Sequence, residues 1–184
     1  MINKISKVIL VVGFSIIGPI SAAATAPIQT VPYVDVAQYL GDWYQIAHIP
    51  LFFEGGNCAC ARQRLTTSST ADVINIFNSC NSGDAGGALR TIKGAATNDD
   101  KNTNAKFTVS FERVPVKGSY WIIGVDPMYR YAVVTDKGGD ALYILSKTPT
   151  LAKNLYDDAV AIGARQVDIS NLAVTDQANC TYPQ

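Results

Sequence analysis

The sequence predicts an all-β fold, an eight-stranded antiparallel up-and-down barrel (a calyx) with one C-terminal α-helix packed outside it. Eight short segments of alternating or continuous apolar character recur with turn residues between them. Gly41-Asp42-Trp43-Tyr44 stands at the head of the first segment, where an indole can plug one end of a barrel. A stripe of apolar residues at helical spacing follows the last segment. Eight strands close into a small barrel that can hold one ligand.

Alternation is clearest in the segment at 106–114, where Phe107, Val109 and Phe111 alternate with polar residues. One face of this strand is therefore apolar and the other faces solvent. Gly138-Gly139 suits a hairpin between the last two segments. The expected strands cover residues 43–49, 58–67, 73–80, 89–96, 106–114, 120–125, 130–135 and 141–147.

A helix is expected directly after the last strand. Thr148 has the chemistry of an N-cap, Pro149 suits the first helical position, and Gly163 suits the C-terminal stop. The helical stripe between them is expected to pack on the outside of the barrel. It consists of Leu151, Leu155, Ala159 and Ile162. Residues 172–174 are expected to add a short strand to the barrel edge.

The N-terminus has the pattern of a secretory signal peptide. Two lysines precede an apolar run at 8–17, and small residues end at Ala24. A membrane anchor is the alternative, but the apolar run is too short to span a bilayer comfortably. We therefore expect a signal at 1–24 and one domain at 25–184. With no cysteine near the cleavage site, the exported protein is expected to be soluble, periplasmic or secreted, and not a lipoprotein.

Charge excludes two classes of partner. Removing the signal's two lysines leaves thirteen basic against fifteen acidic residues, a net charge of −2. Such a chain offers neither a basic field for nucleic acid nor a polybasic membrane patch. There is no phosphate loop or nucleotide fingerprint, and no cofactor is expected.

Four cysteines, an even number in an exported chain, indicate two disulfides with three possible pairings. They are Cys58, Cys60, Cys80 and Cys180. A metal site that uses Cys58, Cys60 and His48, or a free catalytic thiol, would need reduced thiolates, which export disfavours. We expect no metal.

Five stretches together resemble the lipocalin family over the whole mature chain. Residues 41–44 (GDWY), 131–136 (YAVVTD) and 143–149 (YILSKTP) resemble its three ordered motifs. Residues 120–123 (YWII) and 174–180 (VTDQANC) are similar to the branch that contains apolipoprotein D and the bacterial lipocalins. The resemblance implies a barrel that binds a small hydrophobic ligand.

The resemblance also implies roles for particular residues. Gly41 and Trp43 would be structural, and Lys147 replaces an arginine that in the family usually stacks on the motif tryptophan, a contact that a lysine can still make through its charge. It further implies the pairing of Cys58 with Cys180, and hence of Cys60 with Cys80.

Strand parity predicts which side chains point into the barrel. If Trp43 and Lys147 point inward, so do their neighbours at even spacing, and Trp121 resembles a pocket residue of the same branch. Parity places Cys58 and Cys60 outside and leaves the faces of 73–80 undecided. The expected ligand-contacting residues are Gln45, Gln63, Phe107, Val109, Phe111, Trp121, Ile123, Tyr143 and Leu145.

These features predict extracytoplasmic binding and transport of a fatty acid, lysophospholipid or similar lipid, without catalysis. One alternative is an enzyme on the same fold, which would need a free thiol or an acid in the barrel. The other is a protein-interaction module that uses the rim at Leu51-Phe52-Phe53. The only histidine, His48, is expected at the rim. The ligand's identity and the oligomeric state stay open.

Overall fold

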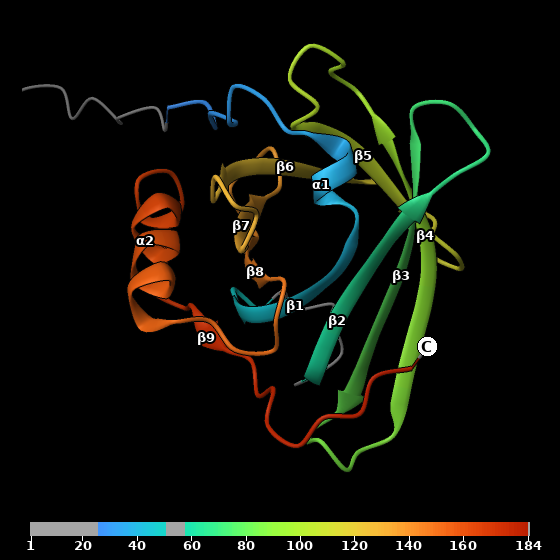
Figure 1. Cartoon of the computed structure of the whole chain (residues 1–184), viewed down its shortest axis with the longest axis vertical. Coiled ribbons are helices and arrows are strands. Elements are labelled where there is room, and N and C mark those ends of the chain that lie inside the picture. Colours follow the sequence, from blue (N-terminus) through green and yellow to red (C-terminus); the bar gives the residue numbers. More distant parts are fainter. Residues whose placement is uncertain (1–25, 51–57, 184) are drawn as a thin grey trace, which may run out of the picture.

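The structure, a computed structural model, describes residues 26–50 and 58–183. One antiparallel sheet in the order β2-β3-β4-β5-β6-β7-β8-β1-β9 closes on itself through the β1–β2 pair (Figure 1). The predicted barrel is thus confirmed. Its elements are α1 (Val36–Tyr39), β1 (Gly41–His48), β2 (Cys58–Thr67), β3 (Val73–Ser82), β4 (Leu89–Asn98), β5 (Lys106–Phe111), β6 (Gly118–Val125), β7 (Tyr131–Thr135), β8 (Leu142–Ser146), α2 (Lys153–Ala164) and β9 (Ala173–Val174).

All eight predicted strands are present, and the short strand near residue 173 pairs with β1. Helix α1 was not predicted, because four residues are too few to show a helical period. Its N-cap is Asp35, whose carboxylate accepts hydrogen bonds from the backbone N–H groups of Ala37 and Gln38. The helix brings Tyr39 to the closed end of the barrel, where its side chain is buried.

Helix α2 begins later than predicted. Ala152 is its N-cap and makes no side-chain cap bond, whereas the hydroxyl of Thr148 donates to the Thr150 carbonyl at 2.6 Å. The prediction that Gly163 stops the helix was also wrong. Gly163 lies inside the last turn, and a Cβ there would come within 2.8 Å of the Leu142 side chain. This glycine lets α2 pack closely on β8.

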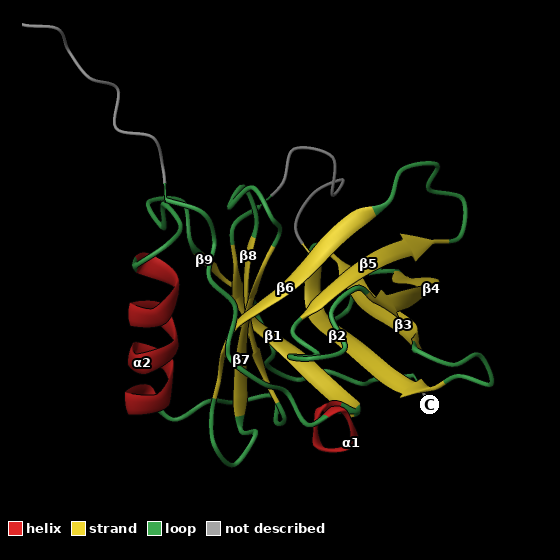
Figure 2. Cartoon of the chain, turned by 90° about the horizontal axis from the view of Figure 1, so that it is seen from above, coloured by secondary structure: helices red, strands yellow, loops and turns green. Residues whose placement is uncertain are grey.

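Two apolar clusters lie on the two faces of the barrel wall. The inner one contains Trp43, Phe107, Ile122 and Leu145. The outer one lies between α2 and strands β6, β7 and β8, where Figure 2 shows the helix standing beside the barrel. No helix in the described parts of the chain is long and apolar enough to cross a membrane.

The cysteine pairing differs from the one that the resemblance implied. The bonds are Cys58–Cys80 and Cys60–Cys180. The register of β2 against β3 shifts between Ala59 and Arg62, and Cys60 has a left-handed φ of 55°. This β-bulge reverses the parity within β2. Cys58 therefore meets its neighbour on β3, while Cys60 turns to the C-terminal tail, where its backbone N–H donates to the Asp176 carbonyl at 2.8 Å.

Candidate ligand cavity

The floor of the barrel is sealed around Trp43. Its indole Nε1 donates to the Tyr39 carbonyl at 2.7 Å, and the Lys147 Nζ lies 4.1 Å from the ring centroid. The predicted contact between Trp43 and Lys147 is therefore present. Lys147 also donates to the carbonyls of Tyr39 and Leu40, at 3.3 and 2.5 Å. Burial lowers the pKa of Lys147 to about 8, against a weaker opposing effect of the Asp42 carboxylate.

Gly41 makes the floor possible. Its φ of +100° is a conformation that favours glycine, and a Cβ there would stand 3.6 Å from the Lys147 Nζ. The structural role that the resemblance implies for Gly41 thus has a physical basis in this chain.

Strands β5 and β8 supply part of the apolar wall above the floor. Phe107, Val109 and Leu145 are buried in the inner cluster, with Phe111 and Tyr143 packed against it. The predicted inward orientation of these five residues is confirmed. Their contact with a ligand stays a prediction.

Polar groups also reach the interior near the floor. The hydroxyls of Tyr39 and Tyr120 are 2.8 Å apart, and the Tyr120 hydroxyl donates to Gln63 Oε1 at 3.1 Å. Burial raises the pKa of both phenols, so each stays protonated at neutral pH. Gln63 thus points inward, as predicted. A small cavity of about 10 Å³ lies among these residues. Its lining is Tyr39, Gln63, Leu65, Ile74, Ile76, Ala96, Phe107 and Tyr120.

A second polar group lies nearer the open end, where β1 and β2 separate. Gln45 lies opposite Leu145 in the β1–β8 register and His48 lies opposite Tyr143, which places both on the inner face. Thr175, from the tail after β9, joins them. Its Oγ1 accepts from Gln45 Nε2 at 2.9 Å and lies 3.3 Å from His48 Nδ1. The tail therefore forms part of the barrel wall.

The predicted orientation of Trp121 and Ile123 was wrong. In the β5–β6 register Trp121 lies opposite Lys106, whose Nζ is 4.8 Å from its ring, and Tyr120 lies opposite the inward-facing Phe107. Trp121 and Ile123 therefore belong to the outer cluster. Both parities of β6 are apolar because α2 backs its outer face, so periodicity could not decide between them.

The sequence reasoning missed several inward-facing polar residues, among them Tyr39, Tyr120 and Thr175. Tyr120 had a usable signal, since a residue that pairs with the start of a clearly alternating strand must share that strand's inner phase. Tyr39 depends on α1, and Thr175 depends on the separation of β1 from β2. Neither leaves a local pattern in the sequence.

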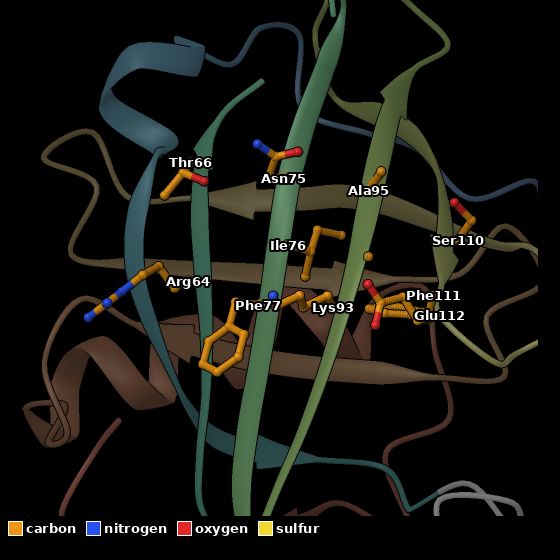
Figure 3. Close-up of a pocket in the computed structure, with 11 residues that line it drawn as sticks. Arg64, Thr66, Asn75, Ile76, Phe77, Lys93, Ala95, Ser110, Phe111 and Glu112 are labelled. Carbon is orange, nitrogen blue, oxygen red and sulfur yellow. The ribbon is translucent and has the colours of Figure 1, made fainter. Parts of the chain in front are cut away.

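A larger hollow of about 590 Å³ lies on the outer face of strands β2–β5 (Figure 3). It is bounded mainly by two outward-facing rows of cross-strand neighbours, Arg64–Phe77–Lys93 and Thr66–Asn75–Ala95. The exposed side chains of Thr66, Asn75, Lys93 and Glu112 border this hollow, whereas the inner face of the barrel is lined by buried apolar residues, so we assign binding of an apolar ligand to the inner face.

The chain matches the family model described as a lipocalin-like domain over residues 34–177. It is 32% identical to apolipoprotein D of Mus musculus over 157 residues, which cover 79% of this chain and 78% of the relative. It is 31% identical to the outer membrane lipoprotein Blc of Escherichia coli K12 over 176 residues, which cover 86% and 96% of the two chains.

The fold is similar to that of insecticyanin from the tobacco hornworm Manduca sexta, with a TM-score of 0.66 and 22% identity. The match covers 86% of this chain and 90% of insecticyanin. At this identity the likeness concerns the fold alone.

Proposed function

Since the chain belongs to the lipocalin family, we propose that it binds one small hydrophobic ligand, a fatty acid, lysophospholipid or similar lipid, inside its barrel and carries it outside the cytoplasm. The observation that supports this most is a barrel sealed at one end by Trp43 and Lys147, with an apolar inner wall above that floor. Such a wall attracts an acyl chain without specific polar contacts.

The energetics of burial are sufficient. Each methylene taken out of water gains roughly 0.8 kcal/mol, so a long acyl chain offers on the order of 10 kcal/mol before the costs of ordering. Micromolar or tighter binding then needs only a few polar contacts. Gln45, Gln63 and Tyr143 could supply them.

The name of one relative supports a lipid ligand, because that relative is an apolipoprotein. Two disulfides favour an oxidising compartment outside the cytoplasm. They engage all four cysteines of the sequence. None is left for lipid attachment, and none is left as the free thiol that one enzyme alternative would need.

Calorimetric titration of the delipidated protein with a panel of acyl ligands tests the proposal. We expect one-to-one binding of long-chain members. Val109→Glu, which puts a charge on the inner wall, should weaken binding more than about tenfold. Ser110→Glu, on the opposite face of the same strand, is the matched control and should leave the affinity unchanged.

Absence of binding by every ligand, with the protein folded, would contradict the proposal. It would favour interaction through the rim at Leu51, Phe52 and Phe53, which lie outside the described residues. Equal loss of affinity in both variants would place the ligand elsewhere than on the inner face.

A further inference from the structure

Three buried side-chain polar atoms in the described part of the chain have no hydrogen-bond partner, namely Arg62 Nε, Ser79 Oγ and Asn78 Oδ1, and Asn78 is the one on the inner face of the barrel. The side-chain oxygen of Asn78, Oδ1, is buried and accepts no hydrogen bond within the described part of the chain. A buried acceptor without a donor costs free energy, and proteins pair the great majority of such atoms. The atom therefore calls for a donor from outside the fold.

Asn78 belongs to the inner face of β3. It lies opposite Gln63 in the β2–β3 register, and residues directly opposite each other share a face of the sheet. Gln63 reaches the interior, where its Oε1 accepts from the Tyr120 hydroxyl. Ile74 and Ile76, at even spacing from Asn78 on the same strand, belong to the inner cluster. The unpaired oxygen thus belongs to the inner face that we assign to the ligand.

Gln63 complements Asn78 chemically. Because its oxygen already accepts from Tyr120, its amide nitrogen can donate into the cavity. The wall thus places an acceptor on β3 next to a donor on β2. A hydroxyl group satisfies both at once, since it donates one hydrogen bond and accepts others. An ionised carboxylate can only accept and would leave Asn78 Oδ1 facing another acceptor.

Apart from the Tyr39 and Tyr120 hydroxyls, the surroundings of Gln63 are apolar. Leu65, Ile76 and Phe107 line the small cavity with Gln63. A ligand that places a hydroxyl between Gln63 and Asn78 must therefore be aliphatic next to that hydroxyl.

We propose, building on the lipid-binding function above, that the preferred ligand is a long-chain aliphatic compound with a hydroxyl group. Its hydroxyl donates to Asn78 Oδ1 and accepts from the Gln63 amide nitrogen. A site built to bond a hydroxyl discriminates strongly against the analogue that lacks it, because the site's polar groups are then left unpaired.

The test compares stearic acid with 2-hydroxystearic and 12-hydroxystearic acids, which share chain length and carboxylate. Calorimetry on the delipidated protein should show at least one hydroxylated isomer bound roughly tenfold or more tightly than stearic acid. Asn78→Leu should remove this preference while leaving stearic acid bound as well as before or better. Gln63→Met is a second variant that should also remove it.

Asn75→Leu is the matched control, since it makes the same substitution on the outer face of the same strand, and it should keep the preference. Equal affinities for all three acids in the unchanged protein would overturn the proposal and indicate that a buried water satisfies Asn78. So would a preference that survives both inner-face variants. Failure of all three acids to bind would instead contradict the lipid-binding function.

Discussion

The two halves of the barrel wall are built differently. Strands β6, β7 and β8 have α2 behind them, the outer apolar cluster extends to β1, and all five residues of β7 are buried. Strands β2–β5 have no such backing, and outward side chains such as Thr66, Asn75 and Lys93 are exposed. Figure 1 shows α2 beside β7 and β8, away from β2, β3 and β4.

The two halves of the wall therefore contribute differently to the stability of the barrel and to its selectivity for ligands. In the helix-backed half the side chains are fixed by packing on one face or the other, and the inward polar groups Tyr120, Gln45 and His48 have hydrogen-bond partners within the fold. In the open half only the inner face is constrained, and there the polar pair Gln63 and Asn78 interrupts the apolar wall. We infer that the backed half holds the barrel's shape and that the open half distinguishes between ligands.

The largest expected effect concerns the disulfide Cys60–Cys180, which links the two halves of the wall. Cys60 on β2 is bonded to the tail that follows β9, which pairs with β1, across a separation of 120 residues, against 22 for Cys58–Cys80. The chain-entropy model gives about 4.7 kcal/mol for a loop of ~100 residues and about 3 for one of ~15. Replacing Cys60 and Cys180 by serine should therefore cost more than replacing Cys58 and Cys80, as measured by urea unfolding.

The reverse order of stabilities would contradict this account of the tail. So would peptide mapping of the oxidised protein that joins Cys58 to Cys180.

Removing the floor should also have a large effect. Trp43→Ala empties a fully buried site and should lower the free energy of unfolding by about 3–5 kcal/mol. Phe77→Ala, at a partly exposed position on the outer face of the open half, should cost about 1 kcal/mol or less. Equal costs in denaturant titrations would show that the two faces are packed alike.

A smaller effect is expected where α2 meets the wall. Gly163→Ala improves helix propensity by about 1 kcal/mol, yet its Cβ would stand 2.8 Å from Leu142, and overpacking costs about 1–3 kcal/mol. We expect a net loss of about 1 kcal/mol and a lower Tm. Ala161, exposed on the same helix, serves as the control. There Ala161→Gly should lower the stability, because glycine has a lower helix propensity than alanine. A rise in Tm for Gly163→Ala would rule out the close contact.

The smallest effect is a pH dependence at the floor. Lys147 has a pKa of about 8 in the folded protein and an ordinary value of 10.5, so between these values the unfolded chain binds more protons. Its contribution to stability therefore rises with pH across this window. In Lys147→Arg the guanidinium stays charged. We expect this variant to be as stable as the unchanged protein, or slightly more stable, at pH 7. At pH 10 it should be less stable than the unchanged protein, as measured by thermal unfolding. A difference that does not vary with pH would contradict the burial of Lys147.

The sequence predicted the strand count and the outer helix because these depend on periodicity. The sealed floor was expected because Gly41, Trp43 and Lys147 lie in stretches that resemble lipocalin motifs. The prediction failed where the register between two strands shifts. The bulge after Ala59 exchanged the partners of Cys58 and Cys60, and parity cannot foresee a bulge. It also failed at Trp121, where a strand buried on both faces has no alternation to follow. Asn78 was undecided for the same reason, since β3 is apolar on both parities at its start.

The central claim is that the inner face of the barrel holds an apolar ligand. Native mass spectrometry of the protein purified from its natural source tests it most directly, with lipid extraction to identify what is bound. We predict a mass increment of one lipid per chain, lost on delipidation, restored by a long-chain acyl compound and absent in Val109→Glu. A bare chain that stays folded and takes up no acyl compound would contradict the claim.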